Sequence, residues 1–439
     1  MNSVEPLTKA DRVCLADSVL GVIVYKNRLT YIVDQIERSK GEIQDASFDD
    51  LLYIRKLLAT YFRFHNTDDI LFEELTAPLQ AGTRFMRCLT ATESIQWPTD
   101  PFLRISVEYS IPQWLLEAWS DSFGLEGVRR LCKECNNRGP VTVRANTLKV
   151  SREQLQVKLA SEGVESLPTK YSPWGLTFTQ GRPSGGTWQL SVSKQRLMEL
   201  QDEGSQLIAL ATGVSEGTES VLDYCAGAGG KSMALAGMLG EGRGVIHAWE
   251  PFSNRRETLR DRIIENNLQY RITVEESLQE VEALSMDCTL VDAPCSSSGT
   301  LRRHPELRWR MEEDIAMREM PELQKEILAN ASRTVRPGGV LVYATCSLLV
   351  EENEDVAMWF ASSSFGEDFE PMALLEPPFE DLRRNGRRPQ TRAEMKSSGE
   401  KEKDGIGGDR DDHMLTLAPH LHGTDGFFIA RWRRHMIGK

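Results

Sequence analysis

The second half of the chain alternates short apolar runs with helical segments, and this pattern constrains the fold more than any other feature of the sequence. After Gln201, six apolar runs predict strands, at residues 221–223, 244–249, 272–274, 288–291, 340–343 and 427–432. Strands that alternate with helices are typical of a doubly wound α/β sheet. We therefore predict a Rossmann-like domain over residues 201–439, closed by the last of these strands.

Two further parts precede this domain, because 439 residues exceed the length of one ordinary domain. Residues 1–95 predict a helical domain, since apolar residues recur at helical spacing at Val13, Leu15, Val19, Leu20 and Ile23, and again between residues 51 and 61. Residues 96–200 predict a small α+β domain that binds RNA or only links its neighbours. There an extended segment, 141–148, precedes a helix that opens at Ser151, with Gln154 at the spacing of a capping box.

One segment of the last domain departs from the alternation. Residues 381–412 are crowded with charged residues and glycine and contain no aromatic residue. Such a composition cannot bury enough apolar surface to fold. We expect a disordered surface insertion there.

The charge balance and the absence of apolar runs limit the environment and the partners. A net charge of -13 argues mildly against tight non-specific binding of nucleic acid, but total charge says little about one face. No apolar run approaches the roughly 20 residues that cross a bilayer. We expect a cytoplasmic monomer without membrane contact, whose eight cysteines are thiols rather than disulfides. Arginines cluster in two places, at Arg302, Arg303, Arg308 and Arg310 and at Arg431, Arg433 and Arg434.

A glycine-rich loop, residues 223–232, follows the first predicted strand and leads into a helix. Glycines there let a ligand approach the helix N-terminus. A P-loop would need glycine where Cys225 stands, and a dinucleotide fingerprint would need glycine or alanine where Ser232 stands. S-adenosylmethionine is the third candidate ligand. Glu250, after the second strand, suits the ribose of any adenosine cofactor and does not choose among them.

Two cysteines follow strands that are consecutive along the chain, the fourth and fifth predicted ones. Cys295 comes after the fourth strand in the run Asp292-Ala293-Pro294-Cys295, and Cys346 comes after the fifth. Ligands bind at the carboxyl ends of parallel strands. If the two strands are adjacent, both thiols face one cleft beside the glycine loop. A buried structural role for each cysteine, or a redox pair, is the alternative.

Paired thiols suit methylation of carbon 5 of cytosine. That carbon is a poor nucleophile until a thiolate adds to carbon 6 and makes it enamine-like. Asp292 is placed to hydrogen-bond the base edge. The base must be unpaired or flipped to be reached. Arg302 and Arg303, close behind Cys295, are candidates for contact with phosphate or base.

The residues that carry this chemistry resemble a known family. The run 292–309, the run 343–347 with the acidic residues that follow it, and the tail 419–431 are similar to signatures of the Nop/Sun family of RNA cytosine-C5 methyltransferases. The tail is similar to the bacterial RsmB-like ribosomal RNA branch, and the helical N-terminus loosely resembles its NusB-like domain. The resemblance covers roughly residues 100–439.

The resemblance implies S-adenosylmethionine as cofactor, ribosomal RNA as partner, and roles for particular residues. Cys346 is then the nucleophile, Cys295 assists release of the product, and Asp292 contacts the base and cofactor. Cofactor contacts fall on the glycine loop and on acids after the strands, namely Cys225, Ala226, Gly227, Ala228, Gly229, Gly230, Lys231, Glu250, Glu275 and Asp292. This loop departs from the family pattern, with Gly227-Ala228 where alanine and proline are usual. Glu276 competes with Glu275 for the place after the third strand.

Other readings remain open at this point. A catalytically silent RNA-binding assembly factor, an enzyme of this fold with a non-RNA substrate, or a tRNA methyltransferase are the rivals. Cys132 and Cys135 have metal-ligand spacing, but no second pair answers them, so no metal is expected.

Overall fold

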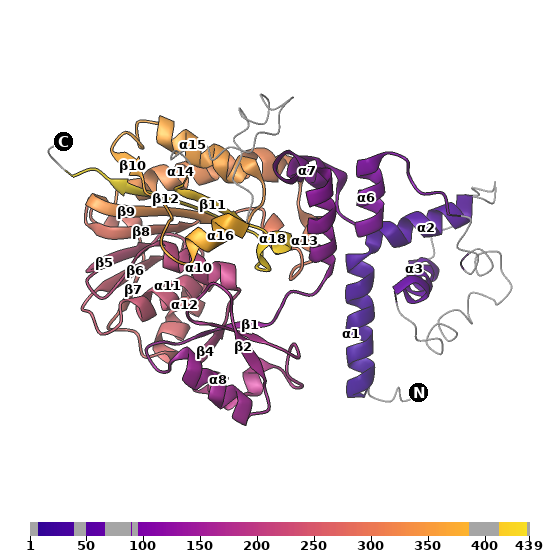
Figure 1. Cartoon of the computed structure of the whole chain (residues 1–439), viewed down its shortest axis with the longest axis horizontal. Coiled ribbons are helices and arrows are strands. Elements are labelled where there is room, and N and C mark those ends of the chain that lie inside the picture. The colour runs from indigo at the N-terminus through magenta and orange to yellow at the C-terminus, as the bar shows by residue number, and fades with distance from the viewer. Residues whose placement is uncertain (1–7, 39–49, 66–88, 90–94, 386–411, 437–439) are drawn as a thin grey trace. The chain divides into compact units, whose positions relative to one another are not determined.

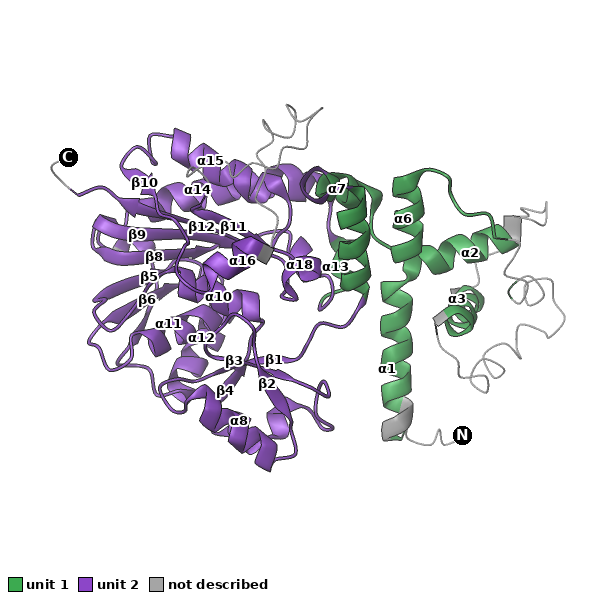
Figure 2. Cartoon of the chain, in the orientation of Figure 1, with its two compact units in different colours: residues 1–120, 125–136, 304–310 green, residues 121–124, 137–303, 311–439 purple. Residues whose placement is uncertain are grey.

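The computed structural model describes residues 8–38, 50–65, 89, 95–385 and 412–436. The chain divides into two compact units, coloured separately in Figure 2. Unit 1 holds residues 1–120, 125–136 and 304–310, and unit 2 holds residues 121–124, 137–303 and 311–439.

Unit 1 is helical, as the sequence predicts. Its helices are α1 (Lys9–Val24), α2 (Lys26–Arg38), α3 (Asp50–His65), α6 (Pro101–Tyr109), most of α7 (Gln113–Asn136) and the short α13 (Leu307–Arg310). Helix α7 kinks at Gly124, where φ is 64° and ψ is 166°. The core of the unit gathers Leu29, Ile32, Val33, Ile36 and Leu57.

Helix α1 leaves several of its apolar side chains exposed. Val13, Leu15 and Val19 are 53%, 55% and 49% exposed, whereas Leu29 and Ile32 of α2 are fully buried. The prediction of a helix is confirmed, and α2 rather than α1 supplies most of the described core.

A buried arginine ties together helix ends within unit 1. The guanidinium of Arg308 donates to the carbonyl oxygens of Val24 (3.1 Å) and Cys135 (3.1 Å), at the C-terminal ends of α1 and α7, and to Asn136 Oδ1 (2.8 Å). Carbonyls in the last turn of a helix lack partners within the helix, and a cation satisfies them well. Arg308 thus acts inside the protein.

Unit 2 contains two sheets, of which the smaller belongs to the predicted α+β region. Its order is β2-β3-β1-β4, with β1 (Thr142–Ala145), β2 (Ser166–Pro168), β3 (Gly175–Phe178) and β4 (Met198–Leu200), all antiparallel. Helix α8 (Arg152–Ser161) packs against it through Leu155 and Leu159. The capping box is confirmed, with Ser151 and Gln154 bonded reciprocally at the start of α8. A short helix, α9 (Ser191–Lys194), precedes β4.

The larger sheet is the doubly wound sheet that the alternation predicts (Figure 1). Its order is β10-β12-β9-β8-β5-β6-β7, and β11 pairs with β12. Strands β5 (Ser220–Asp223), β6 (Val245–Trp249), β7 (Ile272–Glu275), β8 (Met286–Asp292) and β9 (Val335–Thr345) run parallel. The antiparallel edge consists of β10 (Phe369–Pro371), β11 (Met414–Leu417) and β12 (Phe427–Arg434). All six predicted strands are present.

Helices cover both faces of this sheet, because neighbouring strand residues point to opposite sides. Val221 and Leu290 pack with α10 (Glu203–Ala211), α11 (Gly230–Met238) and α12 (Ser253–Glu265). Leu222 and Val291 pack with α14 (Met320–Ser332) and α15 (Glu354–Ser362) on the other face. The sheet therefore has its carboxyl ends free to carry a site.

The segment predicted as a disordered insertion is described only at its margins. Residues 386–411 lie outside the described residues. Before them, α16 (Phe379–Asn385) is helical, with Phe379 and Leu382 fully buried in the core. After them, β11 leads to the short helix α18 (Pro419–His422).

Candidate active site

The glycine loop links β5 to α11 and is shaped by backbone conformations that favour glycine. Gly227 has φ of 55° and Gly229 has φ of 84°. A Cβ added at Gly227 would meet no described atom within 4 Å, so the backbone there is open to a ligand. Ala226 binds β6 through its N–H to the carbonyl of Trp249 (2.9 Å), and the carbonyl of Ala228 accepts from Arg262 (2.5 Å).

Glu250 fixes the glycine loop from the end of β6. Its Oε2 accepts from the N–H of Gly227 (3.0 Å), and its Oε1 accepts from the N–H of Phe252 (3.0 Å). The residue is 3% exposed. Each carboxylate oxygen keeps an acceptor position that these bonds do not use.

Asp223, at the end of β5, was not among the predicted site residues. Its Oδ2 accepts from the Ser232 hydroxyl (2.6 Å), whereas its Oδ1 is buried without a hydrogen-bond partner among the described residues. Burial raises the pKa of the Asp223 carboxyl to about 6. An unpartnered carboxylate oxygen beside the glycine loop fits a cationic ligand such as S-adenosylmethionine. The sequence signal that could have identified Asp223 as a site residue is its place at the end of the first strand of the sheet.

An ion pair links the glycine loop to the cysteine region. Lys231, in the first turn of α11, pairs with Asp292 at the end of β8. Burial alone would lower the pKa of the Lys231 ammonium, but the charge and hydrogen bond of Asp292 outweigh it, so the pKa is raised. Lys231 therefore stays charged, and it lies between the glycine loop and the cysteine region.

The two predicted cysteines lie together. Strands β8 and β9 are adjacent and parallel, with Asp292 opposite Ala344, so the residues that follow them share one edge of the sheet. The sulfurs of Cys295 and Cys346 are 3.3 Å apart. Both residues are partly exposed. We predicted that the two thiols meet if their strands are neighbours, and this prediction is confirmed.

The two thiols differ in acidity. The hydrogen bond from Cys295 lowers the pKa of the Cys346 thiol against the opposing effect of burial, and contacts with Ser297 and Lys231 lower it further. The same hydrogen bond, together with burial, raises the pKa of Cys295 well above its ordinary value. Cys346 is therefore the more acidic thiol of the pair, and Cys295 the less acidic one.

A buried glutamate braces the loop that carries Cys295. Glu352 is fully buried, and its carboxylate accepts from the Ser296 N–H (2.8 Å), the Ser296 hydroxyl (2.5 Å) and Gln324 Nε2 (3.0 Å). Burial raises the pKa of this carboxyl. In the sequence Glu352 is one member of an acidic run, and nothing in that run distinguishes the glutamate that turns inward.

Hydroxyl groups join the Cys295 loop to the Cys346 loop. Ser298 and Ser347 bond through their hydroxyls (3.0 Å), and the N–H of Gly299 donates to the carbonyl of Cys346 (2.9 Å). Asn353 holds the second loop by accepting from the Thr345 hydroxyl (2.5 Å) and donating to the carbonyl of Ser347 (3.0 Å). The two cysteines are thus held by one buried network.

Glu275, a predicted cofactor residue, and Glu276, its rival for that place, each have a partner inside the protein. Glu275 ends β7 and lies 2.6 Å from His247 Nδ1, whereas Glu276 is exposed and pairs with Arg260. Burial raises the pKa of the Cys225 thiol well above its ordinary value, so this third cysteine of the region is a poor nucleophile.

The arginines behind Cys295 are bound to carboxylates. Arg302 and Arg303 each pair with Asp425 and with Asp202, the latter at 3.6 Å from Arg302 and 2.7 Å from Arg303. Arg302 is 8% exposed. The expectation that both contact phosphate or base is wrong for Arg302, whose charge is neutralised inside the protein, and is not supported for Arg303.

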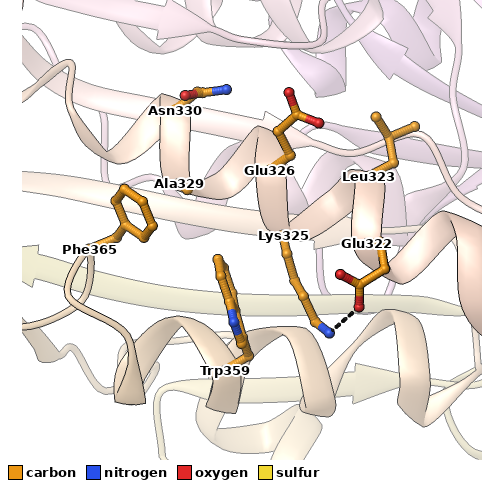
Figure 3. A pocket seen from close by; sticks show the side chains of 8 residues that line it. All are labelled: Glu322, Leu323, Lys325, Glu326, Ala329, Asn330, Trp359 and Phe365. Carbon is orange, nitrogen blue, oxygen red and sulfur yellow. Dashed lines mark hydrogen bonds and ion pairs between the residues drawn. The ribbon is translucent and has the colours of Figure 1, made fainter.

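A pocket of about 590 Å³ lies apart from these residues, between α14 and α15 (Figure 3). Trp359 and Phe365 line one side, and the Lys325–Glu322 ion pair lies on the other. None of its lining residues is a predicted site residue or touches the cysteines. The chemistry of the strand ends, and not the size of this pocket, identifies the candidate active site.

Comparison with known proteins gives the family. Residues 210–433, over half of the chain, match the family described as 16S rRNA methyltransferase RsmB/F, and residues 111–184 match an RsmF/B-like ferredoxin-like domain. The probable ribosomal RNA small subunit methyltransferase B of Bacillus subtilis (strain 168) is 29% identical over 76% of this chain and 69% of its own. The protein of that name from Synechocystis sp. (strain ATCC 27184 / PCC 6803 / Kazusa) is 30% identical over 76% of this chain and 68% of its own.

A solved structure agrees with this assignment. The methyltransferase homolog protein from Pyrococcus horikoshii superimposes with a TM-score of 0.62 at 25% identity, over 77% of this chain and 100% of that one. Among the described helices, none is both long and apolar enough to span a bilayer. The chain belongs to the RsmB/F family of rRNA methyltransferases, enzymes that take their methyl group from S-adenosylmethionine.

Proposed function

We propose that this chain methylates carbon 5 of a cytosine in small-subunit ribosomal RNA, through a transient covalent bond between Cys346 and carbon 6 of the base. The observation that carries the proposal is the pair of sulfurs 3.3 Å apart at the strand ends, of which Cys346 has the lowered pKa. The names of the relatives from Bacillus subtilis and Synechocystis supply the class of RNA.

The residues around the glycine loop fit S-adenosylmethionine. The open backbone at Gly227 and the helix N-terminus at Gly230 would receive its methionine part, and Glu250 would accept from its ribose hydroxyls. The unpartnered oxygen of Asp223 supplies negative charge for a cationic cofactor. We keep Glu275 as the proposed contact to the adenosine. When bound, the cofactor supplies an electrophilic methyl group.

The protein's own groups prepare the base. The Cys346 thiolate adds to carbon 6, which turns the carbon 5–carbon 6 double bond into an enamine-like system whose carbon 5 attacks the methyl group. The Lys231 ammonium favours the thiolate form of Cys346, and Asp292, which Lys231 holds in place, is assigned to the base edge. After methyl transfer carbon 5 carries both a proton and the methyl group.

Release then requires a base, and we assign it to Cys295. Its hydrogen bond with Cys346 is the largest cause of its raised pKa. Once the Cys346 sulfur is bonded to carbon it is neutral and a weak acceptor, so the pKa of Cys295 falls in the adduct. Cys295 then gives its own proton to solvent, its thiolate takes the carbon 5 proton, the double bond re-forms, and Cys346 leaves as a thiolate. One methyl group has entered and one proton has left.

We also propose a division of labour along the chain. Residues 1–95 form the NusB-like helical domain, residues 96–200 the RNA-binding domain, and residues 201–439 the catalytic domain. The match of residues 111–184 to the family's ferredoxin-like domain supports the second assignment.

The test is nucleoside mass spectrometry of ribosomal RNA incubated with the full chain and S-adenosylmethionine. We expect new 5-methylcytosine that disappears with Cys346→Ala. Cys295→Ala should instead accumulate a covalent protein–RNA species on a denaturing gel. The double variant that carries both Cys295→Ala and Cys346→Ala should not form this species. Cys14→Ala, a partly exposed cysteine of unit 1, is the matched control and should behave as the wild type.

The other outcomes have definite meanings. Cofactor binding without methylation of any RNA would contradict the proposal in favour of a silent assembly factor. Methylation of tRNA alone would contradict the choice of ribosomal RNA. A methylated base other than 5-methylcytosine would contradict the cysteine mechanism.

A further inference from the structure

Ser297, two residues after Cys295, has a backbone conformation that serine rarely adopts. Its φ is 59° and its ψ is 24°, in the left-handed region where glycine is favoured. Few described residues other than glycine share this sign of φ, and Ser297 is the one that lies in the Cys295 loop. A serine held there, where glycine would be unstrained, needs a reason in its side chain.

The surroundings hold this conformation from both sides. Before it, Glu352 binds the N–H and hydroxyl of Ser296. After it, the carbonyl of Ser297 accepts from both the N–H and the hydroxyl of Thr300, each at 2.9 Å. Because these bonds fix the backbone, they also fix the position of the Ser297 Cβ, from which the hydroxyl extends.

That side chain reaches the nucleophile. The protonated Cys346 thiol donates to the Ser297 hydroxyl at 3.3 Å, the same distance that separates the two sulfurs, and a Cys346 thiolate would accept from that hydroxyl instead. The hydroxyl and the Cys295 thiol therefore both contact one sulfur atom. A thiolate accepts hydrogen bonds, and each donor stabilises it relative to the thiol.

We propose that Ser297 is a catalytic residue that donates its hydroxyl hydrogen bond to the Cys346 thiolate, and that the left-handed backbone exists to place it there. The inference rests on the proposed role of Cys346 as nucleophile. Ser297 acts twice in that reaction. It stabilises the thiolate before addition to carbon 6, and it stabilises the same charge when the thiolate leaves. In the second step Cys295 is occupied with the carbon 5 proton, so Ser297 is the donor that remains.

The test measures the acidity of Cys346 directly, without RNA. The full chain and its Ser297→Ala and Ser297→Gly variants are alkylated with iodoacetamide over a range of pH, and the modification of each cysteine is followed by peptide mass spectrometry. The midpoint for Cys346 should rise by about one pH unit in both variants, because each loses one donor to the thiolate. Cys14 is the internal reference, and its profile should not move.

The glycine variant makes the test decisive. Glycine adopts the backbone of Ser297 without strain, so Ser297→Gly should unfold at the same urea concentration as the wild type or a higher one. An unchanged Cys346 midpoint in this folded variant would overturn the inference. Retained acidity in Ser297→Gly with loss of acidity in Ser297→Ala would also overturn it, since it would point to backbone strain as the cause.

The same variants separate this inference from the proposed function. A shifted midpoint together with no 5-methylcytosine from the wild type would leave the role of Ser297 toward the sulfur intact and sink the reaction. Methylation that requires Cys346, together with an unchanged pH midpoint of Cys346 alkylation in Ser297→Gly, would support the proposed reaction and contradict the role of Ser297. If both hold, methylation by Ser297→Gly at neutral pH should be about tenfold slower than that of the wild type.

Discussion

The glycine loop and the Cys295 loop are built by the same device. Each follows a strand of the parallel sheet and contains a residue with positive φ. In each, a buried glutamate from a later part of the chain accepts from a backbone N–H of the loop. Glu250 binds Gly227 (3.0 Å), and Glu352 binds Ser296 (2.8 Å). A carboxylate is well suited to this, because it accepts from several donors at once.

The two loops differ in how much hydrogen-bond acceptor capacity remains on the glutamate. Glu352 is enclosed by Ser296 and Gln324, which supply three donors, and burial raises its pKa. Glu250 holds only two backbone N–H groups, one on each oxygen. We infer that Glu352 acts through the loop alone, whereas Glu250 both shapes its loop and binds a ligand. On this inference, two glutamates in similar positions serve different purposes, and their tertiary partners decide which.

The largest effect should follow from Glu352→Ala. The change leaves the N–H and hydroxyl of Ser296 and the amide of Gln324 without their acceptor, at a cost of about 1–3 kcal/mol for each group that stays buried. Urea unfolding should show a loss of stability on the order of 3 kcal/mol, and methylation should fall by at least about a hundredfold. Glu367→Ala, at an exposed glutamate of the same unit, is the control. Cofactor affinity reduced as strongly as methylation would break the comparison.

Glu250→Ala should have the complementary result. Loss of two hydrogen bonds to the ribose would weaken binding of S-adenosylmethionine by roughly tenfold to a hundredfold, at 1.4 kcal/mol for each factor of ten. Titration calorimetry measures this affinity, and the acidity of Cys346 should be unchanged. Normal cofactor affinity in a folded Glu250→Ala variant would show that Glu250, like Glu352, only braces its loop.

The comparison also shows what the sequence could reveal. Six of the eight strands of the large sheet were predicted, because each is a short apolar run set between helical segments, whereas β10 and β11 were not. The meeting of Cys295 and Cys346 followed from the topology of a parallel sheet, in which two adjacent strands end at one edge. Local patterns therefore predicted local structure, and one topological rule extended them to the site.

Residues whose role depends on distant partners could not be predicted in this way. Glu352 meets Ser296 across 56 positions of sequence, and Arg302 meets Asp425 across 123. Nothing near Arg302 tells an arginine paired inside the fold from one exposed to phosphate. Arg431 shows the same, since it was counted in a basic cluster but is 2% exposed and pairs with Glu376 (2.6 Å).

Asp223 should make cofactor binding depend on pH. Burial raises its pKa to about 6, so the carboxyl is ionised at pH 7 and mostly protonated at pH 5. A cationic cofactor prefers the ionised form, and its affinity should therefore be constant above pH 7 and fall about tenfold between pH 7 and pH 5. Calorimetry at several pH values measures this. Asp223→Asn should bind more weakly at pH 7 and lose the pH dependence. A wild-type affinity that does not change down to pH 5 would exclude Asp223 from the cofactor site.

The smallest expected effect separates the two kinds of bond that Glu352 makes. Ser296→Ala removes the hydroxyl bond (2.5 Å) but keeps the backbone N–H bond (2.8 Å), so the loop should retain its main attachment. Stability should fall by about 1 kcal/mol and methylation by only a few-fold, far less than in Glu352→Ala. Urea unfolding and 5-methylcytosine formation measure the two quantities. If Ser296→Ala were as damaging as Glu352→Ala, the hydroxyl network rather than the backbone bond would hold the Cys295 loop, and its likeness to the glycine loop would end at the fold.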